Sequence, residues 1–236
     1  MESIYLVDFD LDIGELIIKN SNIINHIRAL RLKQNEEVFV SNGKGIAAIG
    51  NFYSDKQTTM FKVHKYVEAN KNENNYNLSI LLASLDNKDR MEFAVEKAVE
   101  LGVSNIYVAK SKYSGKKEYK RERLESKILA AFQQSMRSRL TNLFFLNNIF
   151  EIIEKKYYFS QIFVADISGN NLSGSEVERN SLIIIGPEGG LSEEELRVFS
   201  NNETTTIFKI GDSRLRAETA AISSISMFNS ILSNKG

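Results

Sequence analysis

Two loops of this 236-residue chain carry the residue types best suited to chemistry. The first, residues 186–190, has three glycines in five positions and the only proline of the chain, directly after an apolar run. Glycines allow positive φ and a close approach of main-chain N–H groups to a ligand, while the proline stiffens the entry to the loop. A tight strand-to-helix turn with no ligand would use the same residues, so spacing alone leaves both interpretations open.

The second loop, residues 210–219, gathers two arginines and a glutamate between a predicted strand and a predicted helix. A helix N-terminus explains Glu218, because a carboxylate is favourable at the positive end of the helix dipole. It does not explain Arg216, because a positive charge opposes the dipole there. Ligands of open α/β sheets bind beyond the carboxyl ends of the strands. We therefore expect the two loops to face each other across one shared pocket.

The elements that position these loops change in character at a polar segment. Residues 1–67 contain short β-rich runs, and Asn42-Gly43 favours a hairpin turn between two of them. Residues 68–77 are polar and without periodicity, which is typical of a linker. Before this linker the sequence predicts a small barrel or sandwich, with strands at residues 37–41, 45–53 and 58–67.

Beyond the linker, apolar strands alternate with helices. Asp89 and Glu92 resemble a capping box at the start of one helix, and Gly102 is suited to end it in a left-handed conformation. Such alternation predicts a mostly parallel sheet with helices on its faces. The strands are expected at residues 78–84, 105–110, 161–166, 181–185 and 204–210, and further helices at 122–139, from Ser192 onward, and at 218–232.

Composition excludes several classes of protein. The chain has 30 basic and 30 acidic residues, 42% hydrophobic residues and no cysteine, so disulfides, thiolate nucleophiles and thiolate metal sites are absent. With only His26 and His64, a histidine-rich metal site is excluded as well. The sequence contains no nucleophile elbow, no P-loop and no G-x-G-x-x-G fingerprint. It has no apolar run of membrane-spanning length and no signal-peptide layout, so we expect a cytoplasmic protein that does not bind a membrane.

Charge is concentrated in one segment despite the overall neutrality. Residues 110–139 hold ten basic and three acidic side chains, a net charge of +7, with Tyr113 and Tyr119 among them. A smaller basic group, Arg28, Arg31 and Lys33, lies near the N-terminus. Such stretches are typical of phosphate-backbone binding. A solvated loop and helix face would show the same charges, and the sequence alone does not separate the two.

Five segments, taken together and in order, resemble the 16S rRNA uridine-N3 methyltransferases of the RsmE type, within the SPOUT superfamily of S-adenosylmethionine-dependent RNA methyltransferases. They are H-I-R-A-L-R-L at residues 26–32 followed by Asn42-Gly43, K-D-R-M-E with Lys97 and E-L-G at 88–102, Gln134-Ser135 with Arg137, I-G-P-E-G-G-L-S at 185–192, and L-R-A-E-T-A at 215–220. The chain departs from the family where Gly-Pro-Arg-(Ile/Val)-Leu-Arg is replaced by G-D-S-R-L-R at 211–216. The first arginine is thus either displaced to Arg214 or lost.

The resemblance implies a fold and a function. The fold is α/β: a PUA-like RNA-binding β-barrel in residues 1–70, then a Rossmann-like SPOUT methyltransferase domain in residues 71–236 with a C-terminal trefoil knot at about 181–232. The function is methyl transfer from S-adenosylmethionine (SAM), without a metal, to N3 of a uridine in the 16S rRNA of the small ribosomal subunit. Members of the family are homodimers in which the partner subunit completes each active site.

The resemblance also implies the roles of individual residues. Arg216 and Glu218 are the expected catalytic residues. The expected SAM contacts are Gly186, Pro187, Glu188, Gly189, Gly190, Ile210, Gly211 and Leu215. The expected rRNA contacts are Arg28, Arg31, Arg90, Gln134, Arg137 and Arg214.

Uracil N3 carries a proton, so its methylation requires stabilisation of the negative charge that develops on the ring. Arg216 is expected to supply it, because a nearby cation favours the deprotonated form of an acid. Glu218 could orient the Arg216 guanidinium or accept the proton. Orientation is the favoured role, since a carboxylate at a helix N-terminus is a weak base.

Two alternative functions stay open at this point. The chain could be a SPOUT-shaped RNA-binding or assembly protein that has lost turnover, a reading supported by the altered arginine spacing. It could also be a SPOUT methyltransferase that acts on another RNA. Calorimetry with SAM separates the first alternative from an enzyme, because a methyltransferase must bind its methyl donor.

Overall fold

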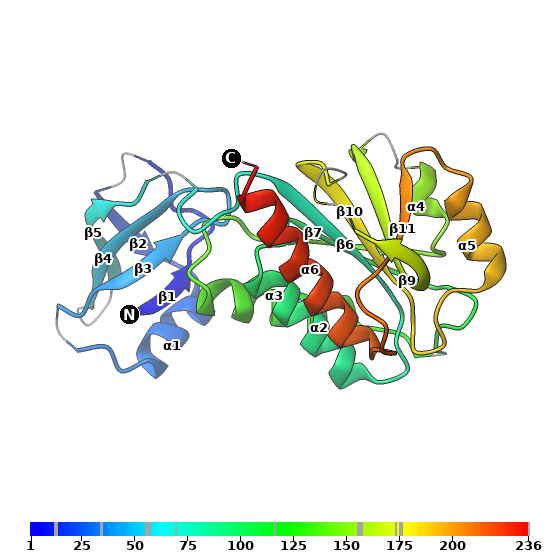
Figure 1. Ribbon diagram of the computed structural model, residues 1–236. Helices are drawn as coiled ribbons and strands as arrows, with labels where there is room; N and C mark the ends of the chain where they lie inside the picture. The colour runs from blue at the N-terminus through cyan, green and yellow to red at the C-terminus, as the bar shows by residue number, and fades with distance from the viewer. Residues whose placement is uncertain are drawn as a thin grey trace. The chain divides into compact units, whose positions relative to one another are not determined.

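The computed structural model describes residues 1–11, 14–33, 35–54, 58–68, 70–115, 117–154, 158–172, 174 and 177–235. This chain forms two compact units (Figure 1). The first unit combines Met1–Glu73 with Phe132–Leu140, and the second combines Asn74–Ala131 with Thr141–Gly236. The domain boundary expected after residue 70 therefore leaves out Phe132–Leu140, which belongs to the first unit although it is distant from the rest of it in sequence. Ala69 and Lys116, from the expected linker and the basic segment, lie outside the described residues.

The first unit is built on a five-stranded sheet with the order β1-β3-β4-β5-β2. Strand β1 pairs with β3 in parallel, and the other pairs are antiparallel. The expected hairpin at Asn42-Gly43 joins β3 to β4: the Asn42 Oδ1 accepts from the Lys44 N–H at 2.8 Å, and Gly43 has φ +71°. The elements are β1 (Glu2–Tyr5), β2 (Glu15–Ile18), α1 (Ser21–Ala29), β3 (Val38–Ser41), β4 (Ala47–Ser54) and β5 (Thr59–Tyr66).

Two edge strands and one helix of the first unit, β1, β2 and α1, were not predicted from the sequence. Ile4 from β1 and Ile18 from β2 pack into the same apolar cluster as Phe61 from β5, so the sheet curls around its own core. Strands β1 and β2 have four residues each, too few to show clear alternation. Helix α1 begins at the cap residue Asn20, whose side chain accepts from the N–H groups of Asn22 and Ile23.

One helix is shorter than expected. The sequence predicts a helix over residues 122–139, but α3 spans Arg121–Gln134. Met136 adopts φ +51°, which no α-helix accommodates, and it lies in the stretch Phe132–Leu140 that belongs to the first unit. There the buried Glu73 carboxylate accepts from the N–H groups of Ser138 and Arg139, both at 2.8 Å. These bonds to Glu73 replace the helical hydrogen bonds that the local sequence favours.

The second unit contains a six-stranded sheet with the order β11-β9-β10-β6-β7-β8, and all its strand pairs are parallel. The predicted alternation of strands and helices is thereby confirmed. Strand β8 and the short helix α4 were not anticipated. The elements are β6 (Asn77–Ala83), α2 (Lys88–Glu100), β7 (Asn105–Ala109), β8 (Asn142–Leu146), α4 (Glu151–Glu154), β9 (Gln161–Asn171), β10 (Asn180–Ile185), α5 (Glu193–Ser200), β11 (Thr205–Lys209) and α6 (Ala217–Ser233).

Both faces of this sheet are covered by helices (Figure 1). On one face, Phe163 of β9 meets Phe228 of α6 with ring centroids 4.8 Å apart, and α6 packs beside α2. On the other face, Val164 belongs to an apolar cluster with Ile152 of α4 and Phe199 of α5. Because successive strand residues point to opposite faces, a strand buried on both must be apolar throughout. This explains the continuous apolar run of β10.

Helix α2 starts differently from the prediction and ends as predicted. Its N-cap is Asn87, whose side chain accepts from the N–H groups of Asp89 and Arg90, so the expected capping box of Asp89 and Glu92 is wrong. The Glu92 carboxylate is instead occupied by the Arg123 guanidinium of α3. At the other end, Gly102 has φ +86° and the Val103 N–H bonds to the Ala98 carbonyl, the arrangement of a Schellman cap.

The Glu92–Arg123 pair predicts a dependence of stability on pH. The hydrogen bond from Arg123 holds the pKa of the Glu92 carboxyl below its ordinary value of 4.5. The stabilisation is therefore present above that ordinary value and lost as the pH falls through the lower value of the folded state. We expect Glu92→Gln to lower the urea midpoint at neutral pH, and the difference from the parent protein to close as the pH is lowered past 4.5.

Glu125→Gln is the matched control, because Glu125 pairs with Arg121 while about half exposed, and such pairs contribute little. Urea unfolding at a series of pH values measures both variants. A Glu92→Gln deficit that stays constant over the whole series contradicts the electrostatic explanation.

No helix in the described ranges combines the length and the apolar character that crossing a bilayer requires.

Candidate functional site

The two loops singled out in the sequence line one pocket of the second unit. Its cavity of about 470 Å³ lies beyond the carboxyl ends of β10 and β11 and beside the middle of β9, at the edge of the sheet where open α/β proteins bind ligands. The volume lies within the range of small-molecule sites. The lining residues include all eight expected cofactor contacts together with Arg214 and, from the middle of β9, Ala165, Asp166 and Ile167.

The first loop presents main chain to this pocket. Gly190 has φ +74°, and its N–H closes the turn on the Pro187 carbonyl at 2.9 Å. A Cβ added to Gly186 would lie 3.1 Å from the carbonyl carbon of Gly190 and from the Leu191 nitrogen. The positive φ thus favours glycine at 190, and the close approach of the main chain leaves little room for a side chain at 186. Helix α5 follows directly, with the predicted capping box of Ser192 and Glu195 in place.

Two contacts hold the first loop in position. The Glu188 carboxylate accepts from the Asp86 N–H, with 3.2 Å to each oxygen, which joins the loop to the segment after β6. The Arg214 Nη2 donates to the Glu188 carbonyl at 3.1 Å, which joins the two loops to each other. Arg214, expected to contact rRNA, thus lies in the pocket wall as well.

The second loop connects β11 to α6. Arg216 is the N-cap of α6, is exposed, and makes no side-chain capping bond. Its neighbours on either side, Leu215 and Ala217, both line the pocket. An arginine in a position that favours Ser, Thr, Asp or Asn is costly for the helix. The cost is consistent with a functional role for the side chain.

Glu218 pairs with a different arginine from the one expected. Its Oε1 lies 3.6 Å from the Arg90 Nε of α2, and the side chain is 11% exposed. Among the described contacts, its buried Oε2 has no hydrogen-bond partner. The proposed orientation of Arg216 by Glu218 is therefore corrected: the carboxylate ties the first turn of α6 to α2. The sequence pattern did not show this pair because 128 positions separate its members, Arg90 and Glu218.

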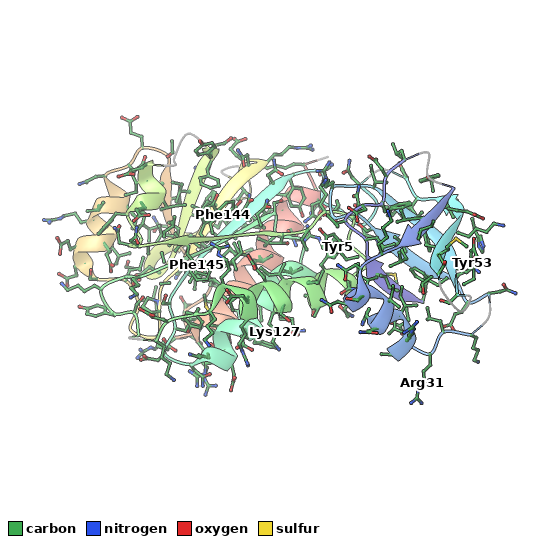
Figure 2. The ribbon with its side chains drawn as sticks, turned by 180° about the vertical axis from the view of Figure 1, so that it is seen from behind. Tyr5, Arg31, Tyr53, Lys127, Phe144 and Phe145 are labelled. Carbon is green, nitrogen blue, oxygen red and sulfur yellow. The ribbon has the colours of Figure 1, made fainter. Side chains whose placement is uncertain are left out.

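The expected rRNA contacts are divided between the units. Arg90 and Arg214 belong to the second unit, and the other four to the first. Arg28 and Arg31 are exposed, at the end of α1 and just after it, and the Arg31 side chain extends outward (Figure 2). Gln134 is exposed at the end of α3.

Arg137 does not suit the expected role of an rRNA contact. Its side chain is 3% exposed and its Nη2 lies 2.8 Å from the Glu73 Oε2. The guanidinium is committed to a buried ion pair, which explains the arginine without any RNA. Sequence reasoning missed this because Glu73 lies in the segment taken as a linker.

Sequence reasoning also missed the wall of the pocket that Ala165, Asp166 and Ile167 provide. The Asp166 Oδ1 accepts from the Ser168 N–H at 2.9 Å and from its Oγ at 2.6 Å. The available signal was position, because Asp166 was the last residue of the strand predicted at 161–166, and strand ends line ligand sites in such sheets. The structure differs in that β9 continues to Asn171, and its pairing with β11 shifts register after Val164, next to these three residues.

Comparisons with known proteins agree with this architecture. A family model described as an RNA methyltransferase domain matches residues 72–229. The chain is 30% identical over 206 residues to the ribosomal RNA small subunit methyltransferase E of Mesomycoplasma hyopneumoniae, with 84% of this chain and 87% of that protein covered. It is 29% identical over 234 residues to ribosomal RNA small subunit methyltransferase E 2 of Borreliella burgdorferi, with 92% of each covered.

A solved structure shows the same fold over the whole chain. It is the ribosomal RNA small subunit methyltransferase E of Neisseria gonorrhoeae bound to S-adenosyl methionine, with a TM-score of 0.84, 23% identity and 98% of each chain covered. The sequence matches and the shared fold together show that the chain belongs to the ribosomal RNA small subunit methyltransferase E family of RNA methyltransferases.

Proposed function

We propose that this protein transfers a methyl group from SAM to N3 of a uridine in 16S rRNA. The observation that carries the proposal is the pocket shared by the glycine loop and the loop that ends at Arg216. The names of the relatives support the choice of small-subunit rRNA as the substrate. The atom N3 and the choice of uridine rest on the family resemblance of the five sequence segments.

The pocket residues fit the methyl donor. A glycine wall without Cβ atoms lets an adenine and a methionine moiety lie against main-chain groups. We assign the hold on SAM to Gly186, Pro187, Glu188, Gly189, Gly190, Ile210, Gly211 and Leu215. When bound, SAM supplies an electrophilic methyl group on a sulfonium, which needs no metal to react.

Arg216 is assigned to the substrate base. Its position as the exposed N-cap of α6, between two pocket-lining residues, supports a role in stabilising the negative charge on the uracil as N3 loses its proton. Glu218 and Arg90 act as positioning residues, because their pair fixes the first turn of α6 against α2. Exclusion of water and alignment of the base in the pocket supply further acceleration.

The finer features of the architecture are part of the same proposal. The curled sheet of the first unit supports a PUA-like RNA-binding barrel, since both edge strands share one core. A knot over about 181–232 is supported by the path after β11, which lies beside β9, while α6 returns to pack on β10, β6 and α2. We also propose a homodimer, and light scattering tests it by a mass near twice 26.8 kDa.

Nucleoside mass spectrometry of 16S rRNA, from cells with and without this gene, tests the function. We expect 3-methyluridine to be lost at one position on deletion and restored by the gene. If the methylated base is found in another RNA, that RNA is the substrate in place of 16S rRNA. No change in any RNA, together with no heat of SAM binding in calorimetry, leaves the non-catalytic RNA-binding alternative.

A substitution at Gly211 tests the assignment of the SAM site. Gly211 lines the pocket, and a Cβ built on it meets no protein atom within 4 Å. We expect Gly211→Val to weaken SAM binding at least about tenfold, which is about 1.4 kcal/mol, by filling space the ligand needs. Isothermal calorimetry measures the change.

Gly14→Val is the control, since Gly14 lies in the first unit and also meets no atom within 4 Å. If the Gly211→Val variant binds SAM as tightly as the parent protein does, SAM does not bind in this pocket.

A further inference from the structure

Tyr113 is an exposed aromatic residue at the edge of the pocket. It follows β7 in the chain, and 52% of its surface is exposed. A Cβ built on Gly189 would lie 3.0 Å from the Tyr113 Cβ and 3.4 Å from its Cγ. The base of the tyrosine side chain therefore rests on the main chain of a pocket-lining residue, while its ring is open to solvent.

The turn that carries Tyr113 is held at several points. The Ser111 N–H donates to the Ser114 Oγ at 2.9 Å, and the Lys112 N–H donates to the Glu195 Oε1 of α5 at 2.8 Å. The Gly115 N–H bonds to the Ser84 carbonyl, just after β6, at 3.3 Å. A side chain on such an anchored turn keeps its position beside the cavity, which a stacking surface needs.

Tyr119, the other tyrosine of the segment, has a different environment. Its hydroxyl donates to the Leu85 carbonyl, and burial, with a smaller effect of the nearby Glu188 and Asp86 carboxylates, raises its pKa to about 12. Tyr119 is thus a neutral internal support for the segment after β6. Tyr113 has no ring contact and no hydroxyl partner among the residues that the structure describes. Its exposure is not explained by the packing of the unit.

The segment of chain that carries Tyr113 is rich in lysine, with one exposed acidic residue, Glu118, in it. Lys110, Lys112, Lys117 and Lys120 are exposed, and none of them takes part in an ion pair within the described ranges. An aromatic ring among exposed cations is the arrangement that proteins use for unpaired nucleotides: the cations hold phosphates and the ring stacks on a base.

We propose that Tyr113 is the platform on which the target base stacks when it leaves the rRNA helix to be methylated. The inference rests on the proposed function, and deepens it by naming the residue that holds the base. A pyrimidine N3 lies on the pairing edge, so the base must be displaced from its partner before it reacts. Stacking on Tyr113 occupies one face of the base and leaves the pairing edge of the base free to reach into the cavity.

The first test measures kcat and KM for methylation of small ribosomal subunits purified from cells that lack this gene. We expect Tyr113→Leu to lower kcat/KM about ten- to a hundredfold, the effect of losing one base–aromatic stack, with unchanged SAM affinity. Tyr113→Phe should restore kcat/KM to within about twofold of the parent, because the ring and not the hydroxyl does the stacking.

Tyr158→Leu is the matched control for this test. Tyr158 is 70% exposed and lies in the same unit, just before β9 and thus at the opposite end of the parallel strands from the pocket. Its substitution should not change kcat/KM.

The second test detects stacking directly. The chain contains no tryptophan, so Tyr113→Trp introduces a single tryptophan, whose fluorescence can be excited separately from that of the tyrosines and is quenched by a stacked base. We expect small ribosomal subunits to quench the fluorescence of the Tyr113→Trp variant and not that of the Tyr158→Trp variant.

Two results would overturn the assignment of Tyr113 while the parent protein still methylates rRNA. One is an equal kcat/KM for Tyr113→Leu and the parent protein, and the other is an unquenched Tyr113→Trp variant. A parent protein that binds SAM but methylates no ribosomal RNA overturns the proposed function instead.

Discussion

Replacing Arg216 with serine is expected to lower the turnover number for rRNA methylation about 10²- to 10³-fold, the cost of removing one preorganised electrostatic contact. Uracil N3 must lose its proton, and the ring becomes negative as the methyl group is transferred. The Arg216 guanidinium is the cation we assign to that charge, at the start of α6 and next to the pocket. SAM affinity should not change, because Arg216 is absent from the pocket lining.

The same substitution should stabilise the protein. Arg216 makes no side-chain capping bond, whereas serine at an N-cap accepts from the N–H groups of the first turn and stabilises a helix by about 0.5–1 kcal/mol. A substitution that lowers the turnover number but raises the free energy of unfolding identifies an arginine with a functional role and not a structural one. An unfolding artefact would lower both quantities.

Single-turnover methylation of unmethylated small subunits, together with thermal unfolding, measures both effects. Arg197→Ser is the control: Arg197 is an exposed arginine in the last turn of α5, and its loss should leave turnover unchanged. Full turnover in the Arg216→Ser variant would remove Arg216 from the mechanism.

Replacing Arg137 with alanine is expected to destabilise the first unit by about 3–5 kcal/mol, as for other buried ion pairs that lose one partner. The side chains of Arg137 and Glu73 are only 3% and 6% exposed. Without the guanidinium, Glu73 keeps its bonds to two N–H groups but carries an uncompensated buried charge. The β3–β4 hairpin should lose stability first, because the Ser138 carbonyl accepts from the Ser41 Oγ and from the Gly45 N–H.

Hydrogen exchange followed by mass spectrometry measures this effect locally, through faster exchange of the β3 and β4 amides. Arg28→Ala is the control, because Arg28 is exposed on α1 of the same unit, and surface substitutions usually change stability by no more than about 0.5 kcal/mol. Weaker binding to rRNA with native exchange rates in the Arg137→Ala variant would restore the role of direct RNA contact that the sequence suggested.

Local patterns in the sequence predicted the elements whose causes are local. The two-sided burial of β10 requires an uninterrupted apolar run, which is visible in the chain. Gly102 and the pair of Ser192 and Glu195 end and start helices through contacts within a few residues. Position in the parallel sheet then predicted that both loops would lie at one edge, and the pocket confirms it.

The predictions that were wrong share one cause, which is competition from partners distant in the chain. Residues 135–139 have helical character, but Glu73 offers their N–H groups and Arg137 a buried carboxylate. Glu92 has the spacing of a capping residue, but Arg123 occupies it. Short strands such as β1 are stable only because the curled sheet supplies the rest of their core.

By itself, the sequence determined the family, the alternation of strands and helices, and the two loops that form the pocket, because each depends on residue types at short spacing. The tertiary structure alone decided the partners of the charged groups: Arg90 for Glu218, Glu73 for Arg137, and the main chain of Gly189 beneath Tyr113. The physical reason is that burial and Coulomb energy depend on distance in space, and the chain brings together residues that no local pattern connects.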